Sequence, residues 1–267
     1  MTSRCFLQSW MHDVFVSVLA SGSSGNAFLV VNQGAAILVD AGLSRRELEK
    51  RMSVFGVEPT QVEAVLLTHE HTDHVRGAKS FCQGNDVCAY GSRGTLSLTP
   101  LDGVEKSVLE TNVEQEIAGV KVRPFKVKHL AAEPVAFSFR IDSVKLSIAS
   151  DLGSVTPHVV REMAGSDVML IEANYDEKML MDGEYPEFLK QAIKGDNGHL
   201  SNSDAGALAR SAAAERTKDI MLVHLSKENN TPELARSAVE SALRESAKQV
   251  RLTVAEHGVP SGPYHLR

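Results

Sequence analysis

The stretch THEHTDH, residues 68–74, places three histidines, a glutamate and an aspartate directly after the apolar run at residues 65–67. Burying an imidazole or a carboxylate without a partner is costly, and a bound metal ion would remove that cost. His69 and His71 lie two positions apart, so both project from the same side of an extended segment. Asp73 and His74 follow at a turn into a helix, where they can face a second point. The stretch therefore predicts a metal site with two pairs of ligands.

Other side chains capable of metal chemistry stand at the ends of predicted strands. Asp40 follows AAILV, His129 follows PFKVK, Asp151 follows LSIAS, and His224 follows DIMLV. In α/β sheets, functional groups gather outside the carboxyl ends of the strands. All of these donors are nitrogen or oxygen atoms, which suit zinc, manganese or iron. Cysteines usually close structural zinc sites, so a set without cysteine favours a catalytic site.

Length and composition narrow the class of protein. The chain has 267 residues, 43% of them hydrophobic, and a net charge of −6, which indicates a globular protein with no overall positive field to attract nucleic acid. Three cysteines without zinc-ribbon spacing favour a reducing compartment, so we expect a cytoplasmic protein. No apolar run approaches the roughly 20 residues that span a membrane, and we expect no membrane partner. The sequence leaves the oligomeric state open.

The order of apolar runs predicts an α/β fold. Strands are expected at residues 14–19, 28–31, 36–39, 62–67, 120–127, 135–141, 144–149, 168–171, 220–223 and 250–254. Ser44 with Glu47 three residues later predicts a helix that ends before Gly56, Thr231-Pro232 predicts the start of a long helix, and a third helix is expected over 203–213. We expect an N-terminal extension at 1–13 and one domain over 14–267, with two packed sheets and helices on their outer faces.

The full set of motifs resembles a known family. His69-x-His71-x-Asp73-His74, together with the polar strand ends, resembles the five-motif signature of the metallo-β-lactamase superfamily. Further segments resemble its YycJ/WalJ-like group of bacterial nucleases and phosphodiesterases: SGSSGN at 21–26, SDLG at 150–153, IEANYD at 171–176, GHLSN at 198–202 and HLSKENN at 224–230. The resemblance covers the chain from Val14 onward. It implies an αβ/βα sandwich with a two-metal site along one edge of two central mixed sheets.

The resemblance also implies a role for each histidine and aspartate of these motifs. One metal ion would be held by His69, His71 and His129, a second by Asp73, His74 and His224, and Asp151 would bridge the two. Asp40 would orient ligands through hydrogen bonds without binding metal itself. Two positions depart from the group's pattern: Leu130 stands where an aspartate is expected, and Tyr175 stands where a histidine is expected.

The implied activity is hydrolysis of phosphodiester bonds. Two divalent ions, zinc or manganese, can share a bridging hydroxide and stabilise both the attacking and the departing oxygens. His199 would bind a phosphate oxygen or protonate the leaving group, and Asp73 belongs to the catalytic set. Ser201, Asn202, Asn229 and Asn230 would hydrogen-bond to the substrate, while Glu70 is expected to face solvent.

Three functions remain open at this point. The resemblance favours a DNA nuclease with exonuclease action, with a nucleic acid, DNA, as its partner. The second is an acyl or thioester hydrolase of the glyoxalase II type, using the same metal ions. The third is a metal-binding module without enzymatic activity, which would have a filled coordination sphere.

Overall fold

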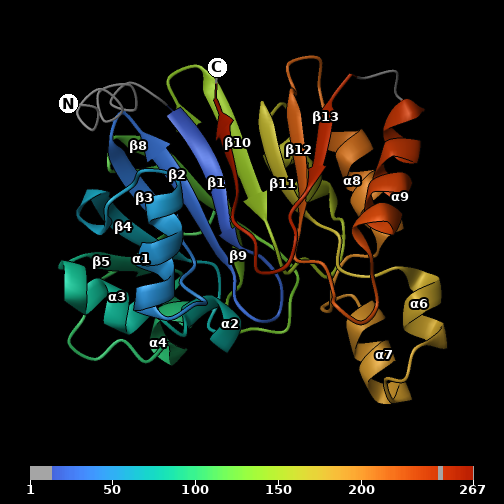
Figure 1. Cartoon of the computed structure of the whole chain (residues 1–267), viewed down its shortest axis with the longest axis horizontal. Coiled ribbons are helices and arrows are strands. Elements are labelled where there is room, and N and C mark those ends of the chain that lie inside the picture. The colour runs from blue at the N-terminus through green and yellow to red at the C-terminus, as the bar shows by residue number, and fades with distance from the viewer. Residues whose placement is uncertain (1–13, 246–248, 267) are drawn as a thin grey trace.

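Two β-sheets pack face to face, and helices cover the outer face of each (Figure 1). The computed structural model describes residues 14–245 and 249–266. The predicted N-terminal extension at 1–13 lies outside the described residues. Across the described ranges, the predicted sandwich of two mixed sheets with flanking helices is confirmed.

The first sheet has, within the described residues, seven strands in the order β14-β1-β2-β3-β4-β5-β6. Their bounds are Val14–Ala20 (β1), Ala27–Asn32 (β2), Ala35–Val39 (β3), Val62–Leu67 (β4), Cys88–Gly91 (β5), Lys106–Val108 (β6) and Ser261–His265 (β14). Strands β3 to β6 run parallel, while β14, β1, β2 and β3 pair antiparallel in turn.

The second sheet repeats this plan, with seven strands in the part of the chain that is described, ordered β13-β12-β11-β10-β9-β8-β7. Their bounds are Gln115–Ile117 (β7), Val120–Lys126 (β8), Val135–Ile141 (β9), Val144–Ala149 (β10), Val168–Glu172 (β11), Asp219–Val223 (β12) and Arg251–Val254 (β13). Strands β10 to β13 run parallel, and β7 to β10 pair antiparallel.

The helices begin where the capping residues predict. Ser44 accepts a hydrogen bond from the backbone N–H of Glu47 at 3.4 Å, and Thr231 accepts one from Leu234 at 3.2 Å. The helices are Arg45–Val54 (α1), Thr72–Val75 (α2), Ala78–Asn85 (α3), Arg93–Leu98 (α4), Pro157–Met163 (α5), Glu177–Asp182 (α6), Glu187–Lys194 (α7), Asn202–Ala212 (α8) and Pro232–Arg244 (α9), with a short 3₁₀ turn at Pro59–Gln61. No helix in the described ranges is long and apolar enough to cross a membrane.

The main apolar core fills the space between the sheets. Phe28 from the first sheet and Phe137 and Phe139 from the second are fully buried in it. Two further apolar layers lie beneath α1 and α3 and beneath α8 and α9. Strands buried on both faces read as continuous apolar runs, which is why polar residues directly after them stand out in the sequence.

One edge of the sandwich collects the carboxyl ends of the parallel strands. In Figure 1, α2 follows β4 and lies below the gap between the two sheets. The α6 and α7 pair lies at the same end of the molecule, beside the second sheet. The residues that follow β3, β4, β10 and β12 are therefore delivered to a common region.

Candidate metal centre

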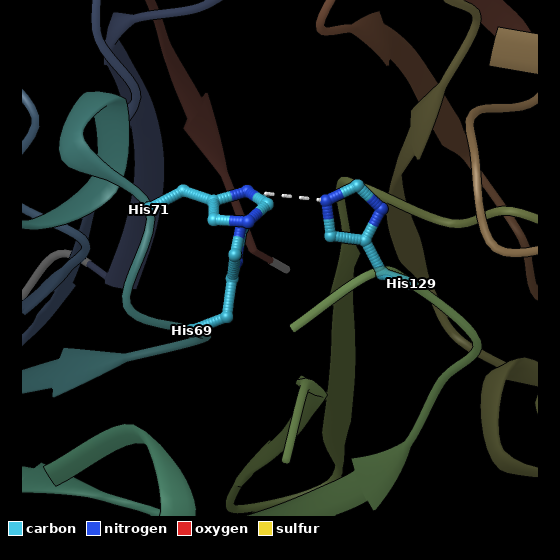
Figure 2. Close-up of side chains that lie close together, drawn as sticks. All are labelled: His69, His71 and His129. Carbon is cyan, nitrogen blue, oxygen red and sulfur yellow. Dashed lines mark hydrogen bonds between the residues drawn. The ribbon is translucent and has the colours of Figure 1, made fainter. Parts of the chain in front are cut away.

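Histidines from both sheets meet in the gap between them. His69 and His71 follow β4, and His129 follows β8. Figure 2 shows His71 and His129 facing each other across the gap, with Nδ1 of His71 3.3 Å from Nε2 of His129. Each of the three offers a ring nitrogen within 4.8 Å of the others. We call these three residues the first ligand group.

A second ligand group, Asp73, His74 and His224, lies beside the first, with its ligand atoms also within 4.8 Å of one another. Asp151 lies between the groups. Its Oδ2 is 2.9 Å from Nε2 of His74, and its Oδ1 is 3.7 Å from Nε2 of His129. The structure thus brings together all seven predicted ligands, with Asp151 in the central position that the resemblance implies.

Three residues of this region leave their strands through a left-handed backbone turn. Asp40 and His224 directly follow β3 and β12, and Asp151 lies two residues after β10, with φ values of 59°, 57° and 54° respectively. Aspartate and histidine adopt this conformation more readily than most residues, at a cost of about 1–2 kcal/mol each. The cost is concentrated at the sheet edge where the candidate ligands converge, a pattern typical of functional sites.

Hydrogen bonds from behind fix the direction in which the histidines point. Nδ1 of His74 lies 2.7 Å from Oδ2 of Asp40, and Nδ1 of His224 lies 2.8 Å from Oε1 of Glu172. Nδ1 of His129 donates to the carbonyl of Gly198 at 3.0 Å. Each bond leaves Nε2 turned toward the centre, as is usual for histidines that bind metal.

The donor atoms fit a divalent metal ion. Nε2 of His69 and Nε2 of His224 are buried and have no hydrogen-bond partner among the described residues. Buried polar atoms are nearly always paired, so two such atoms facing one centre point to a ligand there. Imidazole nitrogens and carboxylate oxygens without cysteine suit zinc, manganese or iron.

Asp40 occupies the orienting position that the resemblance implies. Its carboxylate is fully buried and accepts hydrogen bonds from the backbone N–H of Thr68 at 2.9 Å and from the Thr68 hydroxyl at 2.8 Å. The same hydroxyl lies 3.0 Å from Nδ1 of His69. Asp40 therefore contacts His74 directly and His69 through Thr68, one residue from each ligand group.

The SGSSGN loop, residues 21–26, braces the second ligand group. The Ser21 hydroxyl accepts from the backbone N–H of His224 at 2.6 Å, and Nδ2 of Asn26 donates to Oδ2 of Asp73 at 3.2 Å. The backbone of Gly42, outside this loop, also packs closely against that of Asp73, since a Cβ at Gly42 would lie 1.7 Å from the carbonyl oxygen of Asp73. Only glycine fits at position 42.

Glu172 is a residue of the centre that the sequence analysis missed. It ends β11 and is fully buried. Its Oε1 lies 2.7 Å from Nδ1 of His199 and 2.8 Å from Nδ1 of His224, and its Oε2 accepts from the backbone N–H of Leu152 at 2.6 Å. Its carboxylate therefore connects a predicted ligand to the predicted catalytic histidine.

Carboxylates raise the proton affinity of the second group's histidines. Burial lowers the pKa of His224, but the neighbouring carboxylates, led by Asp151, outweigh it and raise the pKa to about 10. Burial likewise opposes the charged form of His74, and Asp151 and Asp40 raise its pKa well above the ordinary value. By contrast, burial and the nearby His74 hold the pKa of His69 well below the ordinary value.

Metal binding is expected to release protons. His74 and His224 must be neutral to coordinate a cation, yet their pKa values lie above the ordinary value in the metal-free protein, at about 10 for His224. The apparent affinity for zinc should therefore rise between about pH 6 and pH 8, by about tenfold per pH unit for each proton released. Calorimetric titration in buffers of different ionisation enthalpy counts those protons, and an affinity that is constant over this range would contradict the expectation.

A cleft of about 340 Å³ opens onto the ligand cluster. His71, Asp73, His129, Asp151 and His224 line it, together with His199, Ser23, Asn174, Ser226 and a set of apolar residues. His199 presents 23% of its side chain to the surface. The ligands are thus accessible from one side, as a catalytic site requires.

The four residues predicted to contact substrate lie behind this cleft. Ser201, Asn202, Asn229 and Asn230 are all buried, and none of them lines it. Ser201 caps α8 by accepting from the backbone N–H of Asp204 at 3.1 Å, and the amides of Asn202 and Asn230 exchange two hydrogen bonds of 2.9 Å. The hydrogen bonds of Ser201, Asn202 and Asn230 hold the loops together, and the contact of these four residues with substrate stays a prediction.

Expectations from the sequence also concern Glu70, Leu130 and Tyr175. Glu70 does not face solvent freely: its Oε1 accepts from the backbone N–H of Ala132 at 2.8 Å and so joins the histidine motif to the loop after His129. Leu130, one of the two departures from the group's pattern, is 77% exposed. Tyr175, the other, is buried, and burial raises its pKa to about 12. Neither departure lines the cleft.

Comparison with known proteins agrees with this geometry. Residues 35–225 match the family described as "Beta-lactamase superfamily domain". The chain is 34% identical over 237 residues to exodeoxyribonuclease WalJ of Streptococcus pneumoniae serotype 2, covering 86% of this chain and 88% of the relative. It is 34% identical over 236 residues to exodeoxyribonuclease YycJ of Bacillus anthracis, covering 86% and 89%.

The fold has solved counterparts. The crystal structure of the metallo-β-lactamase fold protein YhfI from Bacillus subtilis superimposes with a TM-score of 0.72 and 17% identity, covering 93% of this chain and 99% of that one. At this identity the likeness concerns the fold alone. The two sheets and their flanking helices are thus a known arrangement.

Proposed function

We propose, from the premise that this chain belongs to the metallo-β-lactamase superfamily, that it is a metal-dependent nuclease that hydrolyses phosphodiester bonds at an end of DNA. The support is the similarity to two relatives named exodeoxyribonucleases, each covering 86% of the chain, and the accessible cluster of metal-binding side chains. The nucleic acid substrate is DNA, as those names state for the relatives.

Two divalent ions, zinc or manganese, would occupy the centre. His69, His71 and His129 would hold one, Asp73, His74 and His224 the other, and Asp151 would contact both. When bound, such ions supply Lewis acidity, which activates water near neutral pH and neutralises charge that develops on the phosphate oxygens. The residues around them orient these ligands, through Asp40, Glu172 and Asn26.

His199 is the proposed proton donor. Its Nδ1 lies 2.7 Å from Oε1 of Glu172, so Nε2 remains for the substrate in the cleft. Burial lowers the pKa of His199, but Glu172 and Asp151 outweigh it and raise the pKa above the ordinary value. The raised pKa favours the protonated form of His199, which can transfer that proton to the leaving oxygen as the P–O bond breaks.

The observation that carries the proposal is Glu172 bound to both His199 and His224. It places a proton donor beside the ligand cluster. An alkoxide leaving group needs a proton, because alcohols ionise only near the pKa of water, about 15.7. A thiolate leaves without one, because thiols ionise near pKa 8.5. The pairing therefore favours a phosphodiester over the thioester of a glyoxalase-like enzyme.

The proposal is tested with metal-loaded protein on five substrates: single-stranded DNA, double-stranded DNA, RNA, bis(p-nitrophenyl) phosphate and a glutathione thioester. We expect turnover of DNA and of the chromogenic diester, and loss of both in Asp73→Ala. Thioester turnover without phosphodiester turnover would overturn the proposal in favour of the second reading. A protein that binds metal but turns over none of these substrates would favour the non-enzymatic reading.

Glu172→Gln is expected to lower kcat/KM by about 10- to 100-fold, as is typical when a group that orients metal ligands is changed. It should also move the loss of activity at high pH to lower pH. His199 acts while protonated, and removing the Glu172 charge lowers its pKa, so the proton is lost earlier as pH rises. The measurement is the pH profile of kcat.

The matched control is Asp219→Asn, which changes a buried carboxylate at the other end of the neighbouring strand β12, paired with Arg251. It should alter stability and leave the pH profile in place. A Glu172→Gln profile that superimposes on the wild type after scaling would contradict the role given to Glu172.

A further inference from the structure

One wall of the cleft is apolar and comes from a single short segment. Tyr185, two residues before α7, and Leu189 and Ile193 on α7 line the same cleft as the candidate ligands. Leu189 and Ile193 are four residues apart, so they share one face of the helix. We call these three residues the α7 wall. Figure 1 places α7 at the same end of the molecule as α2.

The α7 wall is fixed relative to His199. The backbone N–H of His199 donates to the carbonyl of Ile193 at 2.9 Å. A Cβ at Gly198 would lie 2.2 Å from that same carbonyl oxygen, so glycine is required for this close approach. The carboxyl end of α7 is therefore held close to the proposed proton donor.

A second tie holds α7 to α6. Lys190 is buried at 8% exposure, and its Nζ donates to the carbonyl of Met181 at 2.7 Å. Burying a lysine is costly unless its charge is paired or hydrogen-bonded. The hydrogen bond of Lys190 fixes α7 relative to α6. The α7 wall is therefore a formed surface beside the ligands.

The cleft thus has two chemically different parts. The ligand cluster and His199 suit an anionic, tetrahedral group, whereas the α7 wall offers an aromatic ring and two branched side chains and no charge. In a nucleic acid, the phosphate and the base supply these two properties, since every base has an apolar π-face. A sugar-phosphate backbone alone would leave the α7 wall without a contact.

We propose that the α7 wall binds the face of the terminal nucleobase while the adjacent phosphodiester lies at the ligand cluster. This inference rests on the proposed nuclease function. The cleft volume of about 340 Å³ lies near the lower end of the range for small-molecule sites, about 300–1,000 Å³. A site of that size can hold a nucleobase beside the ligand cluster.

The experiment uses single-stranded oligonucleotides that differ only at the terminal nucleotide, which carries either a base or an abasic tetrahydrofuran. Each is digested by the metal-loaded wild type, by the double variant Tyr185→Ala, Leu189→Ala, and by Phe188→Ala. Phe188 is the matched control because it is on the same helix, 76% exposed, and outside the cleft. The ratio of kcat/KM for the two substrates cancels any general loss from misfolding.

Loss of the terminal base should lower kcat/KM of the wild type by about 5- to 150-fold, which corresponds to the stacking of one base. In the double variant this ratio should fall below about threefold, and in Phe188→Ala it should equal the wild type. In metal-free protein, a terminal 2-aminopurine should lose fluorescence on binding to the wild type and keep it with the double variant.

The failures are distinguishable. A double variant that cleaves DNA with the wild-type ratio would overturn the role of the α7 wall and leave the nuclease function standing. A wild type that cleaves no nucleic acid would overturn the proposed function, and this inference with it.

Discussion

Replacing Asp151 with asparagine is expected to remove at least one bound metal ion per chain and to lower kcat/KM on DNA by about 10³-fold or more. Asp151 is almost fully buried, and its two oxygens lie among histidines of both ligand groups. Removing its charge takes away the group that faces both proposed ions. Metal content after dialysis and steady-state rates give the two readouts.

The substitution isolates charge from shape. Asparagine has nearly the same size as aspartate and tolerates the left-handed backbone at this position, where φ is 54°. In the metal-free protein, however, His74 and His224 lose the carboxylate that leads in raising their pKa values. Removing one partner of a buried ion pair costs about 3–5 kcal/mol, so the metal-free variant should also unfold at lower denaturant concentration.

Asp196→Asn is the matched control for this change. Its side chain is 80% exposed and pairs with Lys128 at 3.0 Å, beside the His129 loop. An exposed pair contributes at most about 1 kcal/mol, so metal content and activity should stay at wild-type levels. If Asp151→Asn kept both ions and wild-type activity, the bridging assignment would be wrong.

His199→Ala is expected to lower kcat on DNA by about 10²- to 10⁴-fold without changing the metal content. On bis(p-nitrophenyl) phosphate the loss should be less than about tenfold, because the nitrophenolate departs without a proton from the protein. The difference between the two substrates separates proton donation from positioning. A loss by the same factor on both would show that His199 acts on binding or structure instead.

His158→Ala provides the control for removal of a histidine. It lies on α5, with its ring 6.4 Å from that of Phe125, and it does not line the cleft. Both substrates should therefore be turned over at wild-type rates. Only a residue that contacts the leaving group should make the two substrates respond differently.

The fold and the ligand cluster were accessible from the sequence for a physical reason. Strand β12 is buried along its whole length and β3 along all but its first residue, so a polar residue directly after either strand is conspicuous. Short strands were missed because they lack this signature. β5, with the sequence CAYG, and β14, with SGPYH, are formed by pairing with neighbours already in the sheets and not by local preference.

The residues that orient the candidate ligands were harder to predict from the sequence. Glu172 reads in sequence as the end of an apolar strand, and its importance appears only where β11 meets the loops of His199 and His224. Ser201 could have been read as a helix cap, because Asp204 follows three residues later and α8 begins there. Polar residues near a motif can either bind substrate or stabilise the fold, and the burial of each side chain in the structure distinguishes the two roles.

The central claim is that seven side chains hold two metal ions in the gap between the sheets. Anomalous diffraction from crystals of zinc- or manganese-loaded protein tests it most directly. Two peaks are predicted, one among His69, His71 and His129 and one among Asp73, His74 and His224, with Asp151 contacting both. No peak in this gap would contradict the claim, as would a single ion held by the competing cluster of Asp151, Glu172, His199 and His224.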